Sequence, residues 1–207
     1  MHRENIYDLR KLFVGLDKKV NVEGKGRLIP INFDNAATTP PFKRVMKKVL
    51  ETSEYYGSIA RGDGKKSQYC SDLYENSRKY ILEYFNAPED IYTAIFVGNT
   101  TDGLNKLSNI LIENKNDIVI TTRMEHHSND LPWRNKCDLK HVEVDKDGRL
   151  RVEDIENLLE KYQERVKYVT ITGASNVTGY VNDIKRIAKS AHKYGAKIIV
   201  DGAQLIP

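Results

Sequence analysis

The second half of the chain alternates between two patterns of apolar residues. Short β-branched runs bounded by polar residues or glycine predict strands at 92–97, 117–122, 141–144, 167–172 and 197–201. Between them, apolar residues recur at helical spacing over 101–113, 152–164 and 183–194. Strands that alternate with amphipathic helices predict an α/β fold with a mostly parallel sheet flanked by helices.

The first ninety or so residues follow a less regular pattern. Proline at positions 40 and 41 suits the first turn of a helix, so a helix is predicted from there to about residue 56. The other predicted elements are a short helix before residue 15, a linker at 15–30, a strand at 31–35, a loop at 57–66 and a helix at 67–85. We therefore divide the chain into residues 1–30, a helix and linker, and residues 31–207, the main domain.

Composition and charge narrow the possible functions only slightly. Of the 207 residues, 40% are hydrophobic and 30% charged, and 33 basic and 29 acidic residues leave a net charge of +4. The two signs are interleaved, so neither nucleic acid nor a membrane surface is indicated as a partner. Because no long apolar run or signal-like start occurs and Cys70 and Cys137 form no C-x-x-C pair, we expect a reduced, cytoplasmic protein with two structural thiols.

Polar clusters follow several of the predicted strands. In open α/β sheets, ligands bind beyond the carboxyl ends of the strands, so these clusters are the candidates for a site. They cover residues 98–103, 124–129, 173–179 and 201–204.

The first two clusters each allow two interpretations. Thr101, at a predicted helix start, could help to hold a phosphate through a hydroxyl and free N–H groups, or could merely cap the helix. His126 and His127 could suggest a metal, but adjacent residues rarely bind one ion, so we predict none. An imidazole lying flat against a ring-shaped cofactor is the alternative for His126.

The last two clusters are equally open when each is taken alone. Asn176 could bind a ligand oxygen or simply close a turn. Asp201 directly follows an apolar strand, where a carboxylate needs a cation or several donors. It could pair with a protonated pyridine nitrogen, or it could cap the next loop.

Taken in order, the chain contains the motifs DNAATT (34–39), RGDG (61–64), GNTTDGLN (98–105), MEHHSNDLPW (124–133), ASNVTG (174–179) and VDGAQ (200–204). These motifs resemble those of the class V aminotransferases, which use pyridoxal 5'-phosphate. The resemblance extends over about residues 31–207 and is closest to the cysteine desulfurases of the selenocysteine lyase-like group. The resemblance implies the large domain of fold type I, with residues 1–30 belonging to a small domain.

The resemblance also implies roles for individual residues. Thr101 and the Thr100 backbone would hold the cofactor phosphate, and His126 would stack on the pyridine ring and assist proton transfers. Asp201 would pair with the ring nitrogen, while Asn176 and Gln204 would face the phenolic oxygen and the substrate. Ala36, Ala37 and Arg61 would contribute to substrate binding. Arg61 would do so in the neighbouring subunit, which implies a homodimer.

Two departures from the desulfurase pattern keep other reactions open. Ala60 replaces a histidine that usually precedes the Arg-Gly pair, and Gly173-Ala174 replaces a His-Val pair before Ser175. Cysteine would be the substrate and a sulfur-acceptor protein the partner if the chain is a desulfurase. The alternatives are a class V aminotransferase, an epimerase, a kynureninase-like lyase, or a non-catalytic module that binds a partner subunit.

The lysine that binds the cofactor in this family, within Ser-Gly-His-Lys, is expected beyond Pro207. Lys185, Lys193 and Lys197 do not lie in that context. A strand that normally lies beside 92–97 is also expected beyond residue 207, which would leave 92–97 with a bare edge.

We therefore predict that the 207-residue chain by itself does not turn over cysteine. The measurement is alanine formation from L-cysteine by the purified chain in the presence of pyridoxal phosphate. Turnover above that of the cofactor in buffer, or a lysine adduct fixed by borohydride, would contradict this prediction.

Overall fold

The computed structural model describes residues 9–206, which fall into two compact units divided between Phe96 and Val97. The helix predicted before residue 15 lies largely outside the described residues. No helix among residues 9–206 has the length and the apolar composition needed to cross a lipid bilayer.

The first unit contains a hairpin and two helices. Strands β1 (Val20–Val22) and β2 (Gly26–Leu28) pair antiparallel within the segment predicted as a linker. Gly24 and Gly26 have φ of 71° and 75°, a region that favours glycine, so the turn between these strands can be tight. Helix α2 (Lys43–Ser53) and helix α3 (Lys65–Tyr84) confirm the two predicted helices.

The strand predicted at 31–35 is wrong. The polar side chains of this segment bind the local backbone instead of leaving it free for a ladder: Asn32 accepts from the amide of Asp34 at 2.8 Å, and Asp34 accepts from the amide of Ala37 at 3.3 Å. Such bonds compete with strand pairing. Ile31 and Phe33 are exposed, so no apolar face anchors the segment either.

The second unit is built on a four-stranded parallel sheet in the order β4-β3-β5-β6. Its strands are β3 (Ile118–Thr122), β4 (Asp138–Val142), β5 (Val166–Thr172) and β6 (Lys197–Asp201). The helices are α4 (Thr100–Leu111), α5 (His127–Asp130), α6 (Val152–Tyr162) and α7 (Ile184–Lys193), with 3-10 turns η1 (Leu131–Trp133) and η2 (Gln163–Arg165). The predicted α/β class with a mostly parallel sheet flanked by helices is confirmed.

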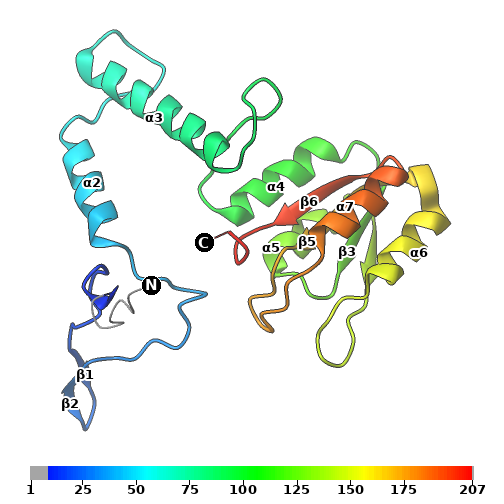
Figure 1. The fold of residues 1–207 in the computed structure, drawn as a ribbon, viewed down its shortest axis with the longest axis horizontal. Coiled ribbons are helices and arrows are strands. Elements are labelled where there is room, and N and C mark those ends of the chain that lie inside the picture. Colours follow the sequence, from blue (N-terminus) through cyan, green and yellow to red (C-terminus); the bar gives the residue numbers. More distant parts are fainter. Residues whose placement is uncertain (1–8, 207) are drawn as a thin grey trace, which may run out of the picture. The chain divides into compact units, whose positions relative to one another are not determined.

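Helices cover both faces of the sheet (Figure 1). Alternate residues of a strand point to opposite faces, so they pack against different helices. Val169 and Ile171 of β5 pack into one core with residues of α6 and α7. Thr170, between them, points to the other face and donates a hydrogen bond to Asn129 of α5 at 2.6 Å. The buried residues of the main core are Ile118, Ile120, Val142, Leu150, Ile155, Leu159, Val166, Val169, Ile171, Ile187, Ala191 and Ala196.

The strand predicted at 92–97 is also wrong. No strand among residues 9–206 pairs with this segment, and Arg78 of α3 takes one of its carbonyl groups, donating to Ala94 O at 2.8 Å. Ile95 is 73% exposed. The composition of a strand is present here without a neighbouring strand to complete the ladder. A smaller difference concerns the strand predicted at 141–144, which the structure places at Asp138–Val142.

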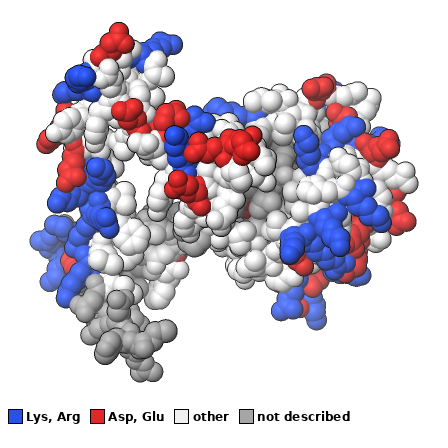
Figure 2. Space-filling view, turned by 45° about the horizontal axis from the view of Figure 1, so that its top comes forward, with Lys and Arg blue, Asp and Glu red and all other residues white. Residues whose placement is uncertain are grey.

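Charged side chains of both signs are intermixed on the face shown in Figure 2. Several of them form ion pairs within the second unit, such as that of Arg186 with Glu153 and Glu156. This arrangement agrees with the interleaved charges of the sequence.

Candidate functional site

The carboxyl ends of β3, β5 and β6 form one edge of the sheet, where most of the predicted site residues lie. Thr172 and Asp201 are register partners at the ends of β5 and β6. The segment after β3 contains His126, and the segment after β5 contains Asn176. The parallel ladder therefore brings together segments that are far apart in the sequence.

Asp201 is a buried carboxylate at this edge, with 5% of its surface exposed. Its Oδ1 accepts a hydrogen bond from the amide of Ala203 at 3.0 Å, so the interpretation as a cap of the next loop is correct for that oxygen. Among residues 9–206, no lysine, arginine or histidine forms an ion pair with Asp201. A cationic ring nitrogen would suit a carboxylate in this environment.

The start of α4 is capped by Asn99, whose side-chain oxygen accepts from the amide of Asp102 at 2.9 Å. The interpretation of Thr101 as the cap is therefore wrong. The amides of Thr100 and Thr101 precede the first bonds of the helix ladder, so they are available to an anion. The carboxylate of Asp102 also lies in this turn. A hydrogen bond from Lys106 and another from the Gly98 amide lower the pKa of Asp102.

His126 immediately precedes α5, and its ring nitrogen caps this short helix. The Nδ1 atom accepts from the amide of Ser128 at 3.2 Å and lies 2.9 Å from the Ser128 hydroxyl. That hydroxyl lies 2.7 Å from Oγ1 of Thr101, so the structure connects the predicted phosphate residue with the predicted stacking residue. Within residues 9–206, no three histidine, cysteine, aspartate or glutamate side chains are grouped so that they could hold a metal ion.

Asn176 is exposed in a tight turn that other groups close. The Ser175 hydroxyl accepts from the amides of Val177 and Thr178 at 3.2 Å each, and the Ser175 amide donates to Tyr180 O at 2.9 Å. The Asn176 side chain is therefore not what closes the turn. It lines a cavity of about 420 Å³ together with His126, Glu125 and Arg123.

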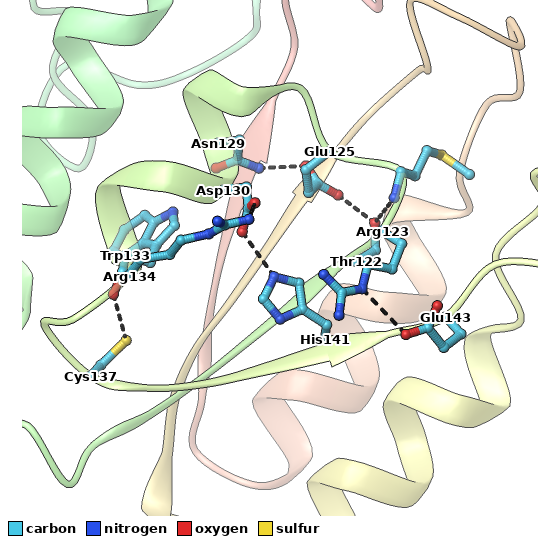
Figure 3. A network of polar contacts seen from close by, with 11 residues as sticks. Thr122, Arg123, Glu125, Asn129, Asp130, Trp133, Arg134, Cys137, His141 and Glu143 are labelled. Carbon is cyan, nitrogen blue, oxygen red and sulfur yellow. Dashed lines mark hydrogen bonds and ion pairs between the residues drawn. The ribbon is translucent and has the colours of Figure 1, made fainter.

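A half-buried carboxyl group that we did not predict, Glu125, also lines this cavity. It accepts hydrogen bonds from Thr122 and Asn129 at 2.6 Å each, as Figure 3 shows. Burial raises the pKa of Glu125 to about 7, and the nearby charge of Asp201 adds to that rise, although the two hydrogen bonds favour the charged form. This edge of the sheet thus holds two carboxyl groups, of which one titrates near neutral pH.

A second set of polar contacts, centred on Asp130, links α5 to the edge strand β4. Asp130 lies 2.8 Å from Nε2 of His141 and also pairs with Arg134 (Figure 3). Burial tends to raise the pKa of Asp130, but the hydrogen bonds from Arg134 and His141 outweigh it and lower that pKa. Nearby, burial raises the pKa of Cys137 to about 11, so this thiol is protonated at neutral pH and is a poor nucleophile.

The structure therefore groups some of the predicted residues and leaves others elsewhere. Thr101, His126, Asn176 and Asp201 belong to the second unit and its carboxyl edge, with Thr100 beside Thr101 and Gln204 in the exposed segment after β6. Ala36, Ala37 and Arg61 belong to the first unit, and their roles stay predictions. We did not single out Ser128, Glu125 or Asn129, although they lie in the quoted MEHHSN motif.

The second unit is an α/β structure with an all-parallel sheet, and hydroxyl, imidazole and carboxylate groups lie at the carboxyl ends of its strands. This is where α/β proteins of this class bind their ligands. The chain matches the family model for class V aminotransferases over residues 31–207, and it belongs to this family. This finding confirms the predicted resemblance.

Individual relatives agree with the family. The chain is 34% identical over 214 residues to a probable cysteine desulfurase of Borreliella burgdorferi, covering 99% of this chain and 49% of that protein. It is 36% identical over 191 residues to a putative cysteine desulfurase of Plasmodium berghei, covering 86% and 35% of the two chains. The chain spans about half the length, or less, of the curated relatives it matches.

Solved structures share the fold. The apo structure of a cysteine desulfurase from Thermococcus onnurineus superposes with a TM-score of 0.70 and 32% identity, covering 82% of this chain and 43% of that one. A NifS-like protein from Rickettsia africae, at 24% identity and a TM-score of 0.69, covers 82% of this chain and 46% of that one and supports the fold alone.

The raised pKa of Glu125 predicts how stability depends on pH. The native state binds a proton more tightly than the unfolded chain, whose glutamate has its ordinary pKa of 4.5. The free energy of unfolding should therefore fall between pH 4.5 and 7, by on the order of 3 kcal/mol, and change little from this source above pH 7. Glu125→Gln should remove this decline, as measured by urea unfolding across that range.

The matched control is Glu143→Gln, because Glu143 is an exposed residue that pairs with Arg123 on the surface. It should keep the wild-type dependence on pH. Equal slopes for Glu125→Gln and the wild type would contradict the assignment of this titration to Glu125.

Proposed function

We propose that this chain provides the pyridoxal phosphate-binding part of a cysteine desulfurase, an enzyme that converts L-cysteine to L-alanine while the sulfur passes to a thiol. The names of the curated relatives support the choice of reaction, at 31–36% identity. The observation that carries the proposal is Asp201, a buried carboxylate at the same sheet edge as the His126 imidazole and without a cationic partner among residues 9–206.

The residues present fit the cofactor. Asp201 would pair with the protonated ring nitrogen, because a buried carboxylate is stabilised by a cation and keeps that nitrogen protonated. The amides of Thr100 and Thr101, at the start of α4, would hold the phosphate. When bound, pyridoxal phosphate supplies an electron-withdrawing ring that stabilises negative charge on the substrate carbon next to the amino group.

The other residues would serve the substrate. His126 would cover one face of the ring and assist proton transfers with its imidazole, which lines the same cavity as Asn176. Asn176 and Gln204 would face the phenolic oxygen and the substrate. Ala36, Ala37 and Arg61 would contribute to the substrate pocket, with Arg61 acting across a homodimer. A sulfur-acceptor protein would be the partner of the complete cycle.

The binding of the cofactor can be tested on the chain itself. We predict that Asp201→Asn weakens the binding of pyridoxal phosphate roughly 10- to 100-fold in equilibrium dialysis, because a charge-assisted hydrogen bond contributes about 1.5–3 kcal/mol. Asp147→Asn, a change of an exposed loop carboxylate, should leave the affinity unchanged. Equal affinities for both variants would contradict the role of Asp201.

The reaction is tested on the protein purified from its natural source under native conditions. We expect alanine and sulfide, in the presence of a reducing thiol, to form from L-cysteine in equal amounts. Transamination or racemisation of amino acids, or cleavage of kynurenine, with no product from cysteine would favour another class V reaction. No turnover despite bound cofactor would favour a non-catalytic binding module.

A further inference from the structure

The hydroxyl group of Ser128 links two motifs of the site, GNTTDGLN (98–105) and MEHHSNDLPW (124–133). Ser128 lies in α5, between Thr101 at the start of α4 and His126 in the segment after β3. Its Oγ atom is 2.7 Å from Oγ1 of Thr101 and 2.9 Å from Nδ1 of His126. Both distances are those of good hydrogen bonds, so the three side chains form a continuous chain.

The direction of these hydrogen bonds follows from the Ser128 backbone amide, because an amide N–H is always a donor. The backbone amide of Ser128 can only donate, and it donates to Nδ1 of His126 at 3.2 Å. A ring nitrogen that accepts a hydrogen bond carries no proton, so the proton of the neutral imidazole lies on Nε2. With Nδ1 unprotonated, the Ser128 hydroxyl can only be the donor in its contact with Nδ1, where it shares the single lone pair of that nitrogen with the amide, and it can accept from the hydroxyl of Thr101.

We propose that Ser128 is a positioning residue that holds His126 in the tautomer protonated on Nε2 and connects this histidine to Thr101. The inference rests on the proposed function, since it assigns His126 the role of a residue that moves protons at the ring. Its effect is to leave one nitrogen, Nε2, as the proton donor of the imidazole. Ser128 would act only through His126, without touching the substrate itself.

A second consequence concerns the phosphate residue. Thr101 has a single hydroxyl proton, and in this arrangement it points to Ser128. An anion at the start of α4 that takes this proton would withdraw it from Ser128, whose own hydroxyl would remain free to donate to His126. The histidine would therefore keep its tautomer when phosphate binds, because the amide and hydroxyl of Ser128 both remain as donors.

The test is ¹⁵N NMR of the histidine side chains of the full 207-residue chain at alkaline pH, where imidazoles are neutral. His126→Gln identifies the resonances of His126 by their loss. In the wild type, we expect Nδ1 to show the shift of an unprotonated nitrogen and Nε2 that of a protonated one. Adding inorganic phosphate should leave this pattern in place.

Variants separate this role from a merely structural one. Ser128→Ala keeps the backbone amide donor and removes the hydroxyl donor, so the two nitrogen shifts should move part of the way toward each other, whereas Ser128→Thr should restore the wild-type pattern because it keeps the hydroxyl. Ser190→Ala is the control, since the Ser190 hydroxyl bonds Glu156 at a distant place on α7. Should Ser128→Ala fail to fold, Thr101→Val, which removes the outer hydroxyl alone, should still leave Nδ1 unprotonated.

A proton on Nδ1 in the wild type, or identical shifts in Ser128→Ala and the wild type, would overturn the inference. Neither result depends on the cofactor. Failure of the proposed function would instead appear as no binding of pyridoxal phosphate by a chain whose His126 has the expected tautomer. The two failures are therefore distinguishable.

Discussion

The arrangement of the candidate site depends on the side-chain amide of Asn129. Its nitrogen donates to Glu125 and its oxygen accepts from Thr170, so both ends of a fully buried group are satisfied. This pair of bonds fastens the segment after β3 to the middle of β5, through a residue on the face of the sheet opposite the main core. Because α5 is only four residues long and cannot be stable alone, such anchoring is what gives His126 and Ser128 fixed positions.

The same contact explains why the site combines rigidity with a titratable group. A carboxyl group partly removed from water is stable where hydrogen bonds replace those lost to water, and Thr122 and Asn129 provide them for Glu125. Asp201 lies close enough to raise the pKa of Glu125 further. A cation beside Asp201 would reduce this repulsion, so the binding of a cationic ligand at this edge would lower the pKa of Glu125.

Much of the second unit could be predicted from the sequence because its elements are regular. The strands at 118–122, 166–172 and 197–201 are dense in β-branched residues, and the helices between them have apolar residues at helical spacing. The segment 92–97 has a similar composition but lacks a neighbouring strand among residues 9–206, and pairing is a property of two segments. In the segment 31–35, polar side chains bind the local backbone instead. The hairpin at 20–28 was missed because its strands are only three residues long, too short for a reliable pattern, and are exposed.

For the site, the order of motifs after strands predicted which segments would meet, since parallel strands bring their ends to one edge. The individual contacts could not be predicted in this way. The bond between Thr101 and Ser128 joins residues 27 positions apart, and the choice of Asn99 over Thr101 as the cap depends on the backbone angles at the helix start.

The segment at 92–97 has a practical consequence for anyone who prepares this chain. This stretch is rich in aromatic and β-branched side chains, largely exposed, and without a ladder partner among residues 9–206, so a second molecule can add a strand to it. We therefore expect this short stretch, more than the well-packed core of the sheet, to limit solubility at high concentration.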